Sequence, residues 1–260
     1  MVSRRNVQIT SDDITLDGAL FTPPGEGPHP ALVVCHGMPA APQGKQTDAN
    51  VPDTAPSYPE IAEQCADEGF ITCVFNFRGT GNSGGNFDPF GWTIDLASVL
   101  SFLETSPEVD PARIYCLGSS LGGAVVIYTA AHHPAVAAVV SFASPATMTE
   151  RVDPKESIAR FRKLGIIRDE DFPQNVPLWA QSNEKISPLK WVGNIAPKPL
   201  LLLHGDVDDV VDPEDLDTLF ALANEPKEKR LLPGVGHRFR YEETVRTLAL
   251  DWLKKLAQTE

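Results

Sequence analysis

The chain has 260 residues, 42 % of them hydrophobic, and a formal net charge of −13 at pH 7. This length and hydrophobic share are typical of one α/β domain with a sizeable core. The acidic balance argues against nucleic acids and anionic membranes as partners, because both attract basic surfaces.

Apolar patterns predict alternating strands and helices along the chain. In chain order they indicate an antiparallel strand at residues 14–21, a buried strand at 31–35, an irregular loop at 39–57, an amphipathic helix at 58–68, a strand at 71–77, a helix at 92–103, a strand at 113–117, a buried helix at 123–131 and strands at 136–142 and 199–203. Strands that alternate with helices form parallel sheets with right-handed crossovers. We therefore expect the α/β fold class, with a mostly parallel central sheet and helices on both faces.

Residues 146–196 interrupt this alternation. They are charged and helix-prone, yet they contain Trp179 and Trp191 among several Phe and Leu residues. Because exposed aromatic patches are costly, these side chains need a surface to pack on. We expect a small helical cap insertion at 146–196 over an α/β core formed by 1–145 and 197–260. A peripheral pair of helices on the edge of the sheet is the alternative.

Residues 118–122, Gly-Ser-Ser-Leu-Gly, join the predicted strand at 113–117 to the helix at 123–131. Gly-x-Ser-x-Gly between a strand and a helix is the pattern of a nucleophile elbow. The turn is so tight that side chains at the glycine positions would collide with neighbouring backbone. It holds Ser120 in a strained conformation, with its hydroxyl raised into a cleft. A Ser-Gly-rich turn without chemistry is the alternative.

A serine nucleophile needs a base, and the base needs an orienting carboxylate. The strand at 199–203 runs into His-Gly-Asp-Val-Asp-Asp-Val-Val (204–211), which places carboxylates where open α/β sheets carry their active sites. His237 follows in a Gly-flanked loop after a short strand. The order Ser120, Asp208, His237 is the order that such a serine hydrolase requires. The rival acids are Asp206, Asp209 and Asp212.

Two further motifs accompany the elbow, the acid loop and the histidine loop: Val-Val-Cys-His-Gly-Met at 33–38 and Arg-Gly-Thr-Gly-Asn-Ser at 78–83. With them the chain resembles an α/β-hydrolase fold serine hydrolase over nearly its whole length. The first motif is similar to the family's oxyanion loop, and the second to its Arg-Gly-x-Gly-x-Ser loop. Within the superfamily the chain looks like compact bacterial carboxylesterases of the cinnamoyl and feruloyl type, and like prolyl-oligopeptidase-like catalytic domains. It departs from the pattern at Asn76, where Asp is common, and in having His-Gly-Met instead of His-Gly-Gly-Gly.

The resemblance implies a Ser-His-Asp triad. Ser120 would be the nucleophile, His237 the general base and then acid, and Asp208 the buried orienting carboxylate. Asp208 is preferred over its neighbours because it matches the family's His-Gly-x-x-Asp-x-x-Val spacing. We expect the backbone N–H groups of Met38 and Leu121 to form the oxyanion hole.

The expected enzyme cleaves carboxylic esters with short-chain or aromatic acyl groups through an acyl-enzyme, with Trp179 and Trp191 in contact with the substrate. The alternatives are a prolyl-oligopeptidase-like peptidase, a thioesterase and, from a different class, a non-catalytic binding protein on the hydrolase fold. Such binding proteins usually lose a triad member, whereas this chain retains all three. No cofactor or metal is implied, and the expected partner is a small-molecule ester. The residues allow a homodimer without indicating one.

Several other conspicuous residues have structural interpretations. We expect His36 and His204 to be structural residues at strand ends, and Arg78 to brace its loop through an internal ion pair instead of binding a substrate carboxylate. The four cysteines are Cys35, Cys65, Cys73 and Cys116. They show no zinc spacing, and buried reduced thiols are preferred over a disulfide. No basic-then-apolar leader and no apolar run near the ~20 residues of a membrane span is found, so we expect a cytoplasmic protein without a signal peptide.

Overall fold

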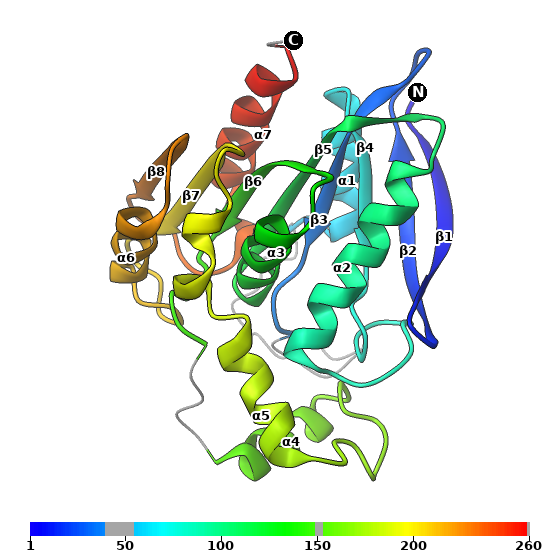
Figure 1. The fold of residues 1–260 in the computed structure, drawn as a ribbon. Helices are drawn as coiled ribbons and strands as arrows, with labels where there is room; N and C mark the ends of the chain where they lie inside the picture. The colour runs from blue at the N-terminus through cyan, green and yellow to red at the C-terminus, as the bar shows by residue number, and fades with distance from the viewer. Residues whose placement is uncertain (40–54, 149–152, 259–260) are drawn as a thin grey trace.

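A mixed sheet forms the middle layer of the protein, and helices pack on both of its faces (Figure 1). The computed structural model describes residues 1–39, 55–148 and 153–258. The strands of these residues are β1 (Ser3–Ser11), β2 (Ile14–Thr22), β3 (His29–Cys35), β4 (Ile71–Phe75), β5 (Val109–Ser119), β6 (Val136–Phe142), β7 (Leu200–Gly205) and β8 (Lys227–Leu232). Their order across the sheet is β1-β2-β4-β3-β5-β6-β7-β8.

The sheet is parallel except at one edge. β1 pairs with β2, and β2 with β4, in antiparallel register. All pairs from β4 through β3 to β8 are parallel. The predicted α/β class with a mostly parallel sheet is confirmed, and the carboxyl ends of the parallel strands share one edge, where such sheets carry their sites.

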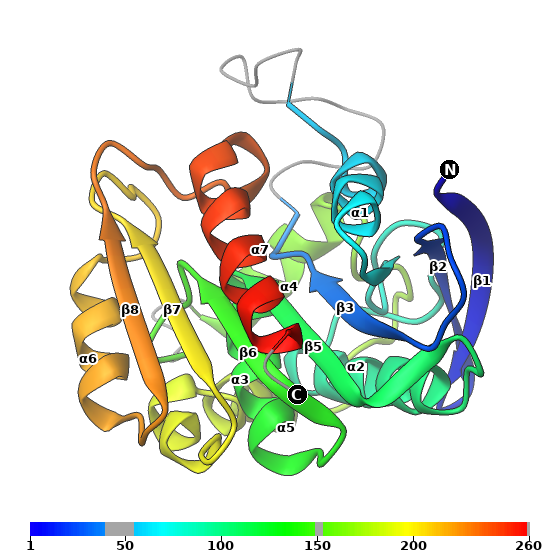
Figure 2. The same ribbon diagram turned by 90° about the horizontal axis from the view of Figure 1, so that it is seen from above.

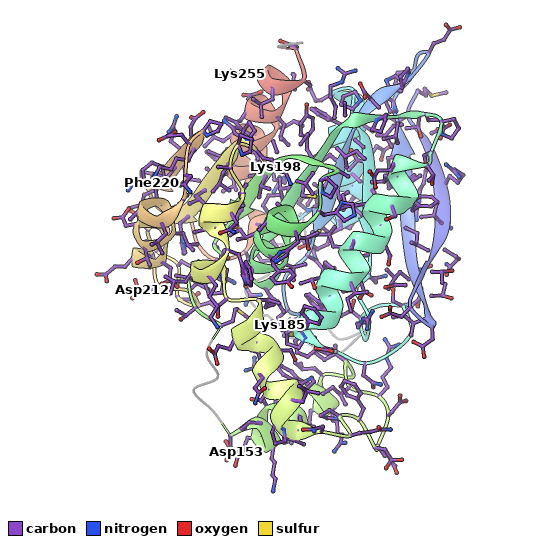
Figure 3. All side chains as sticks on the ribbon, in the orientation of Figure 1. Asp153, Lys185, Lys198, Asp212, Phe220 and Lys255 are labelled. Carbon is purple, nitrogen blue, oxygen red and sulfur yellow. The ribbon has the colours of Figure 1, made fainter. Side chains whose placement is uncertain are left out.

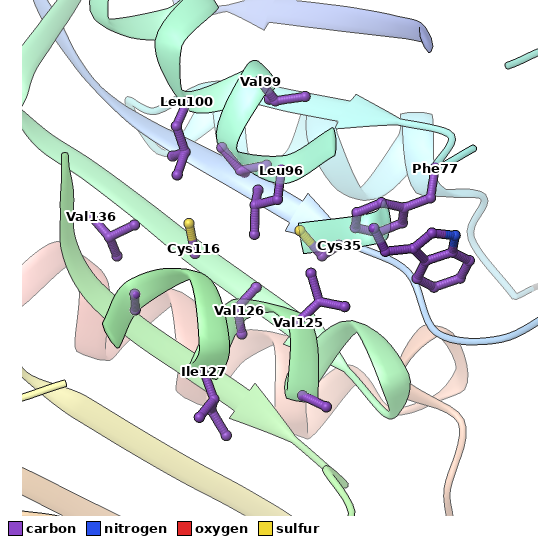
Figure 4. Close-up of a cluster of buried hydrophobic side chains, with 14 of the residues drawn as sticks. Cys35, Phe77, Leu96, Val99, Leu100, Cys116, Val125, Val126, Ile127 and Val136 are labelled. Carbon is purple, nitrogen blue, oxygen red and sulfur yellow. The ribbon is translucent and has the colours of Figure 1, made fainter. Parts of the chain in front are cut away.

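Helices cover the sheet in two groups, which Figure 2 separates clearly. One face carries α1 and α7, and the other carries α2, α3 and α6. Their bounds are α1 (Tyr58–Asp67), α2 (Pro89–Glu104), α3 (Leu121–His132), α6 (Glu214–Leu222) and α7 (Glu243–Ala257). In β3, Val33 packs toward α2 and α3, whereas Val34 packs toward α1 and α7. This two-sided burial explains the continuous apolar runs of the parallel strands, and Figure 4 shows the cluster between α2, α3 and the sheet.

The predicted elements are present, with differences at their ends. α2 begins before the helix predicted at 92–103, because Asp88 Oδ1 accepts a hydrogen bond from Phe90 N–H at 3.1 Å and Pro89 suits the first turn. The irregular loop predicted at 39–57 lies largely outside the described residues.

The state of the cysteines agrees with the preference for buried reduced thiols. All four cysteines are buried and free. None of the helices in the described ranges combines the length and apolar composition needed to span a membrane. Within the same ranges, no three His, Cys, Asp or Glu side chains are grouped so as to hold a metal ion.

The described part of residues 146–196 forms α4 (Pro154–Lys163), α5 (Val176–Lys185) and two 3₁₀ turns, η1 (Pro188–Lys190) and η2 (Val192–Asn194). Figure 1 shows α4 and α5 together beyond one end of the sheet, apart from the helices on its faces. Their buried side chains belong to the same apolar cluster as those of α2 and α3.

Hydrogen bonds connect this insertion to the segment that follows the carboxyl end of β4. Trp179 Nε1 donates to the Phe87 carbonyl oxygen at 3.1 Å. Arg168 N–H donates to Asn86 Oδ1 at 2.7 Å, and the Arg168 guanidinium donates to the Ser83 carbonyl at 2.7 Å. The insertion is therefore attached at the end of the sheet where the parallel strands terminate. That it roofs the nucleophile stays a prediction.

Candidate active site

Ser120 lies at the junction of β5 and α3, where its backbone adopts φ 56° and ψ −123°. A positive φ is strained for a residue that carries a Cβ. Both flanking glycines are needed: a Cβ at Gly122 would approach the His36 carbonyl oxygen to 2.5 Å, and one at Gly118 would run into the Gly122 carbonyl. The turn predicted from Gly-x-Ser-x-Gly therefore forms at this junction.

The hydroxyl of Ser120 does not cap the helix that follows it. A serine at an N-cap normally accepts a hydrogen bond from the first turn, but the Ser120 side chain makes no such bond. Its backbone N–H donates to the Phe142 carbonyl at 2.9 Å, and its carbonyl accepts from Ala124 N–H at 3.2 Å. The preceding Ser119 is buried within β5. Of the two serines, the half-buried Ser120 is the one available to a reactant.

The loop after β3 approaches Ser120 closely. A Cβ on Gly37 would lie 2.9 Å from Ser120 Cβ and 3.6 Å from its Oγ, so this loop runs beside the hydroxyl. Met38, one predicted oxyanion donor, is the next residue of that loop. Leu121, the other, is the first residue of α3, where a backbone N–H has no acceptor within the helix. The positive end of the α3 dipole favours negative charge at the same place.

His36, beside this loop, has the structural role that the sequence predicts. Its Nδ1 lies 2.7 Å from the Gly37 carbonyl oxygen, and its Nε2 accepts from Phe77 N–H at 3.4 Å. The ring packs edge-on against Phe77 and Trp92. Burial lowers the pKa of His36, and the hydrogen bond to Gly37 opposes this only in part.

Asp208 and His237 are brought into contact by the loops that follow β7 and β8. His237 Nδ1 lies 2.8 Å from Asp208 Oδ2, and the Asp208 side chain is fully buried. Because an ionised carboxylate can only accept hydrogen bonds, Nδ1 carries the proton and His237 Nε2 keeps a lone pair. An imidazole oriented in this way is suited to act as a base.

Four hydrogen bonds hold Asp208 as a carboxylate. Oδ1 accepts from Val210 and Val211 N–H, each at 2.9 Å. Oδ2 accepts from His237 Nδ1 at 2.8 Å and from His204 Nε2 at 3.1 Å. Burial alone would raise the pKa of this carboxyl, but the bonds from the two histidines and the two backbone N–H groups outweigh it and hold the pKa well below its usual range. Asp208 is therefore charged at neutral pH.

The other acids of this loop have different positions. Asp206 Oδ1 accepts from a backbone N–H at 2.7 Å in the loop before His237, which ties the two loops together. Asp212 Oδ1 accepts from a backbone N–H at 2.9 Å at the start of α6, where Figure 3 labels it. Asp209 is exposed. Among these described carboxylates, Asp208 is the one that reaches His237.

His204 is the residue of this cluster that sequence reasoning missed. Its predicted role is structural, yet the structure places its Nε2 on the carboxylate of Asp208. A spacing of four residues indicates contact on a helix, but His204 belongs to β7 and Asp208 to a turn, so no periodicity signals the pair. The sequence feature that could have indicated this contact is a histidine at the end of a buried strand, directly before a carboxylate-rich loop.

The contact between Ser120 and His237 stays a prediction. The Ser120 side chain makes no capping bond to α3, whereas Asp208 and His237 are joined by a hydrogen bond. Catalytic hydrogen bonds are often long or poorly aligned without substrate and tighten only in the reacting complex.

Arg78 forms the internal ion pair that the sequence predicts. Its Nη2 lies 2.7 Å from Asp95 Oδ1 and 3.1 Å from Asp12 Oδ2. The Asp95 side chain is fully buried, and its Oδ2 also accepts from Arg78 N–H at 2.8 Å. These bonds brace the Arg-Gly-x-Gly-x-Ser loop against β1 and α2.

The two tryptophans of the insertion pack at different places. Trp179 is 4 % exposed and lies edge-on to Phe87, with ring centroids 6.3 Å apart. Trp191 lies against Tyr128 and His132 of α3, at centroid distances of 5.4 and 4.5 Å. Both rings join the insertion to the core. Their predicted contact with substrate stays a prediction.

A cavity of about 940 Å³ borders Trp179. Its walls come from the start of α2, from residues 169–175 and from α5, and include Phe90, Phe172 and Leu178. Ser120 and His237 are not among the described residues that line it.

Comparison with known proteins places this geometry in context. Residues 56–260 match the model of the Prolyl oligopeptidase family. The uncharacterized protein YfhR of Salmonella typhimurium is 28 % identical over 186 residues, which are 72 % of this chain and 61 % of that protein. The chain thus spans less than two thirds of this relative's length.

Solved structures share the fold. The α/β hydrolase GrgF from Penicillium superposes with a TM-score of 0.73 at 24 % identity, over 97 % of this chain and 98 % of that one. Est1E from Butyrivibrio proteoclasticus, solved with ferulic acid bound, gives a TM-score of 0.68 at 21 % identity, over 96 % and 97 % of the two chains. The chain has the α/β-hydrolase fold.

Proposed function

The chain belongs to the prolyl oligopeptidase family, and on that premise we propose that it is a serine hydrolase that cleaves carboxylic esters with short-chain or aromatic acyl groups. Ser120 is the nucleophile, His237 the base and Asp208 the orienting carboxylate. The observation that carries the proposal is the 2.8 Å hydrogen bond between His237 Nδ1 and a fully buried Asp208. It supplies an oriented base with a lone pair on Nε2 in a chain that also presents an uncapped elbow serine.

In the first half of the proposed reaction, Ser120 Oγ attacks the carbonyl carbon of the ester while His237 Nε2 takes the hydroxyl proton. Negative charge develops on the former carbonyl oxygen, and the N–H groups of Met38 and Leu121 donate to it. Asp208 stabilises the imidazolium without taking its proton. The intermediate then expels the alkoxide, which receives the proton from His237, and an acyl-Ser120 ester remains.

In the second half, water replaces the alcohol. His237 takes a proton from water as the oxygen attacks the acyl carbon, and it returns that proton to Ser120 Oγ as the acyl bond breaks. The carboxylic acid leaves, and the free enzyme is restored. No cofactor is required at any step of this cycle.

The proposal also specifies the kind of acyl group that the enzyme accepts. Ferulic acid, an aromatic carboxylic acid, is bound in the similar structure of Est1E, which supports an aromatic or other compact acyl group here. The family match supports a second candidate, a peptidase with the same Ser120, Asp208 and His237. Both candidates share the acyl-enzyme and differ in the leaving group.

Two measurements test the proposal. Fluorophosphonate labelling followed by peptide mass spectrometry is expected to place the adduct on Ser120, with Ser120→Ala as the unlabelled variant and Ser119→Ala as the matched control that still labels. A panel of p-nitrophenyl esters and aminoacyl anilides then separates esterase from peptidase. An adduct on Ser119, or none on folded protein, would refute the assignment of the nucleophile. Faster cleavage of the anilides would favour the peptidase.

A further inference from the structure

Two histidines share one carboxylate oxygen in this site. Asp208 Oδ2 lies 2.8 Å from His237 Nδ1 and 3.1 Å from His204 Nε2. Catalysis as proposed uses only the first of these contacts. The second is made by a side chain that is 1 % exposed and fixed at the end of β7.

The surroundings of His204 determine its protonated nitrogen. Its Nε2 lies within hydrogen-bond distance of Asp208 Oδ2 and also 3.2 Å from the Val211 carbonyl oxygen. Both oxygens can only accept, so Nε2 carries a proton and donates to both. His204 therefore acts on Asp208 as a donor, through one N–H that it shares with the Val211 carbonyl oxygen.

We propose that His204 is a positioning residue of the active site, whose Nε2–H fixes the Asp208 carboxylate and takes up part of its negative charge. As a result His237 is held in one orientation, and Asp208 stabilises its imidazolium form less strongly than it otherwise would. This inference rests on the function proposed above. It assigns a role to a buried histidine that the acyl-enzyme cycle itself leaves unused.

The first part of the argument concerns orientation. A carboxylate has about four acceptor positions, and here all are filled: two by the backbone N–H groups of Val210 and Val211, and two by the histidines. With the side chain fully buried, no solvent contact can replace a lost donor. Removal of His204 leaves Oδ2 with His237 alone, and the carboxylate loses one of the contacts that fix its rotation.

The second part concerns charge. Each donor to a carboxylate withdraws negative charge and weakens the oxygen as an acceptor for the others. Without His204, Asp208 Oδ2 attracts the His237 Nδ1 proton more strongly, and the imidazolium becomes more stable than in the native site. The base then stays protonated up to a higher pH, so the acidic limb of the pH–rate profile is expected to move upward.

The charged groups closest in the chain to this cluster are Asp206, Asp209 and Asp212 in the acid loop, Arg238 directly after His237, and Glu242 beside the histidine loop. Asp206, Asp212 and Glu242 each accept from a backbone N–H group, and Asp209 is exposed. All five remain in the variants described next, so their contribution to a pH profile cancels in the comparison.

The experiment compares His204→Leu with His204→Gln in the full chain. Leucine removes the donor and keeps the bulk, whereas the glutamine amide can place an N–H near the position of Nε2. The readouts are kcat/KM for p-nitrophenyl acetate from pH 5 to 9 and the far-downfield proton resonance of His237 Nδ1–H in NMR spectra. Leu202→Ala, in the same strand and 2 % exposed, serves as a destabilised control with the hydrogen bonds intact. His204→Met replaces His204→Leu if the latter does not fold.

For His204→Leu we expect kcat/KM to fall about tenfold, the effect of losing one hydrogen bond to a charged group. The acidic limb should move to higher pH and the His237 proton resonance should shift. His204→Gln should restore the profile, and Leu202→Ala should leave the limb unmoved. The inference is overturned if His204→Leu changes neither the acidic limb of the pH–rate profile nor the His237 proton resonance. It is also overturned if folded His204→Gln shows the same pH–rate profile and resonance as His204→Leu. If the wild-type protein hydrolyses no ester, the proposed function fails, while the resonance, which needs no substrate, still tests His204.

Discussion

Gly37 and Ser120 are packed so closely that no side chain fits between them. A Cβ on Gly37 would lie 2.9 Å from Ser120 Cβ and 2.9 Å from the Ser119 carbonyl oxygen. The Ser120 backbone cannot shift away easily, because its N–H donates a hydrogen bond to the Phe142 carbonyl oxygen at 2.9 Å. The loop that carries Met38 can therefore lie beside the hydroxyl only with glycine at this position.

Gly37→Ala should accordingly damage catalysis more than folding. Either the loop or the elbow must shift, and a misplacement of about 1 Å near the reacting atoms costs roughly 100-fold in rate. We expect a loss of about that size in kcat/KM for p-nitrophenyl acetate, with a folded protein by circular dichroism. Gly84→Ala is the control, because its nearest neighbour would be 3.4 Å from the new Cβ. Undiminished kcat/KM in Gly37→Ala would separate this loop from the site of reaction.

Asp208→Asn should be the most damaging amide substitution in the acid loop. The asparagine amide can donate to His237 Nδ1, which favours the wrong tautomer, a change that costs about 10⁴-fold in kcat in the serine-protease triad. Asp209→Asn, one residue along and exposed, is the matched control and should stay near wild type. Steady-state measurements of kcat on wild type, Asp208→Asn and Asp209→Asn test this prediction. A larger loss of kcat in Asp209→Asn than in Asp208→Asn would show that the acid had been assigned to the wrong position.

Asp208 should also make stability depend on pH in the acid range. Its pKa in the folded protein is held well below the usual value by the bonds from His204, His237 and the backbone, against the effect of burial. A carboxyl shifted in this direction contributes stability that is fully present above its unfolded pKa of about 3.9 and is lost as the pH falls toward the folded value. The difference in unfolding free energy between wild type and Asp208→Asn should therefore narrow below about pH 4.

Urea unfolding at a series of pH values from neutral to acid measures that difference. Asp209→Asn again serves as the control, because an exposed carboxylate should contribute little to the slope. A gap between wild type and Asp208→Asn that stays constant down to the acid transition would contradict the prediction.

A local pattern in the sequence predicts the elbow turn, and the family resemblance singles out Asp208 among the carboxylates of the acid loop. Gly118 and Gly122 signal a turn in which side chains have no room, and the structure forms it with Ser120 at positive φ. Asp208 matches the His-Gly-x-x-Asp-x-x-Val spacing of the resembled family, and the structure sets it against His237. Both inferences depend on short stretches of chain, where sequence distance and spatial distance are closely linked.

Contacts between distant segments could not be predicted in this way. Arg168 donates to the Ser83 carbonyl, and Trp179 donates to the Phe87 carbonyl, across more than eighty positions of the chain. Carbonyl acceptors occur at every residue, so nothing in the sequence distinguishes the ones that are used. The bond from His204 to Asp208 was missed for a related reason, since it depends on the course of a turn and not on a repeating period.

The insertion provides the last prediction, which concerns acyl-chain preference. Trp179 is 4 % exposed and bonded to the segment after β4, whereas Trp191 packs on α3. If α4 and α5 roof the nucleophile, the acyl pocket is bounded, and kcat/KM for p-nitrophenyl esters should peak at short chains. Loosening either anchor should then change the preference along the series from acetate to palmitate.

Trp179→Ala and Trp191→Ala are the variants to compare, with methyl ferulate added to the ester series. Replacing a buried tryptophan by alanine costs about 3–5 kcal/mol, so Trp179→Phe is the fallback if the alanine variant does not fold. Leu178→Ala, on the same helix and 64 % exposed, should keep both stability and preference. We expect at least one Trp variant to accept longer chains relative to acetate. Unchanged preference in both folded variants would place the insertion at the edge of the sheet, and a wild-type maximum at palmitate would exclude a bounded pocket, because a long acyl chain needs an open apolar surface.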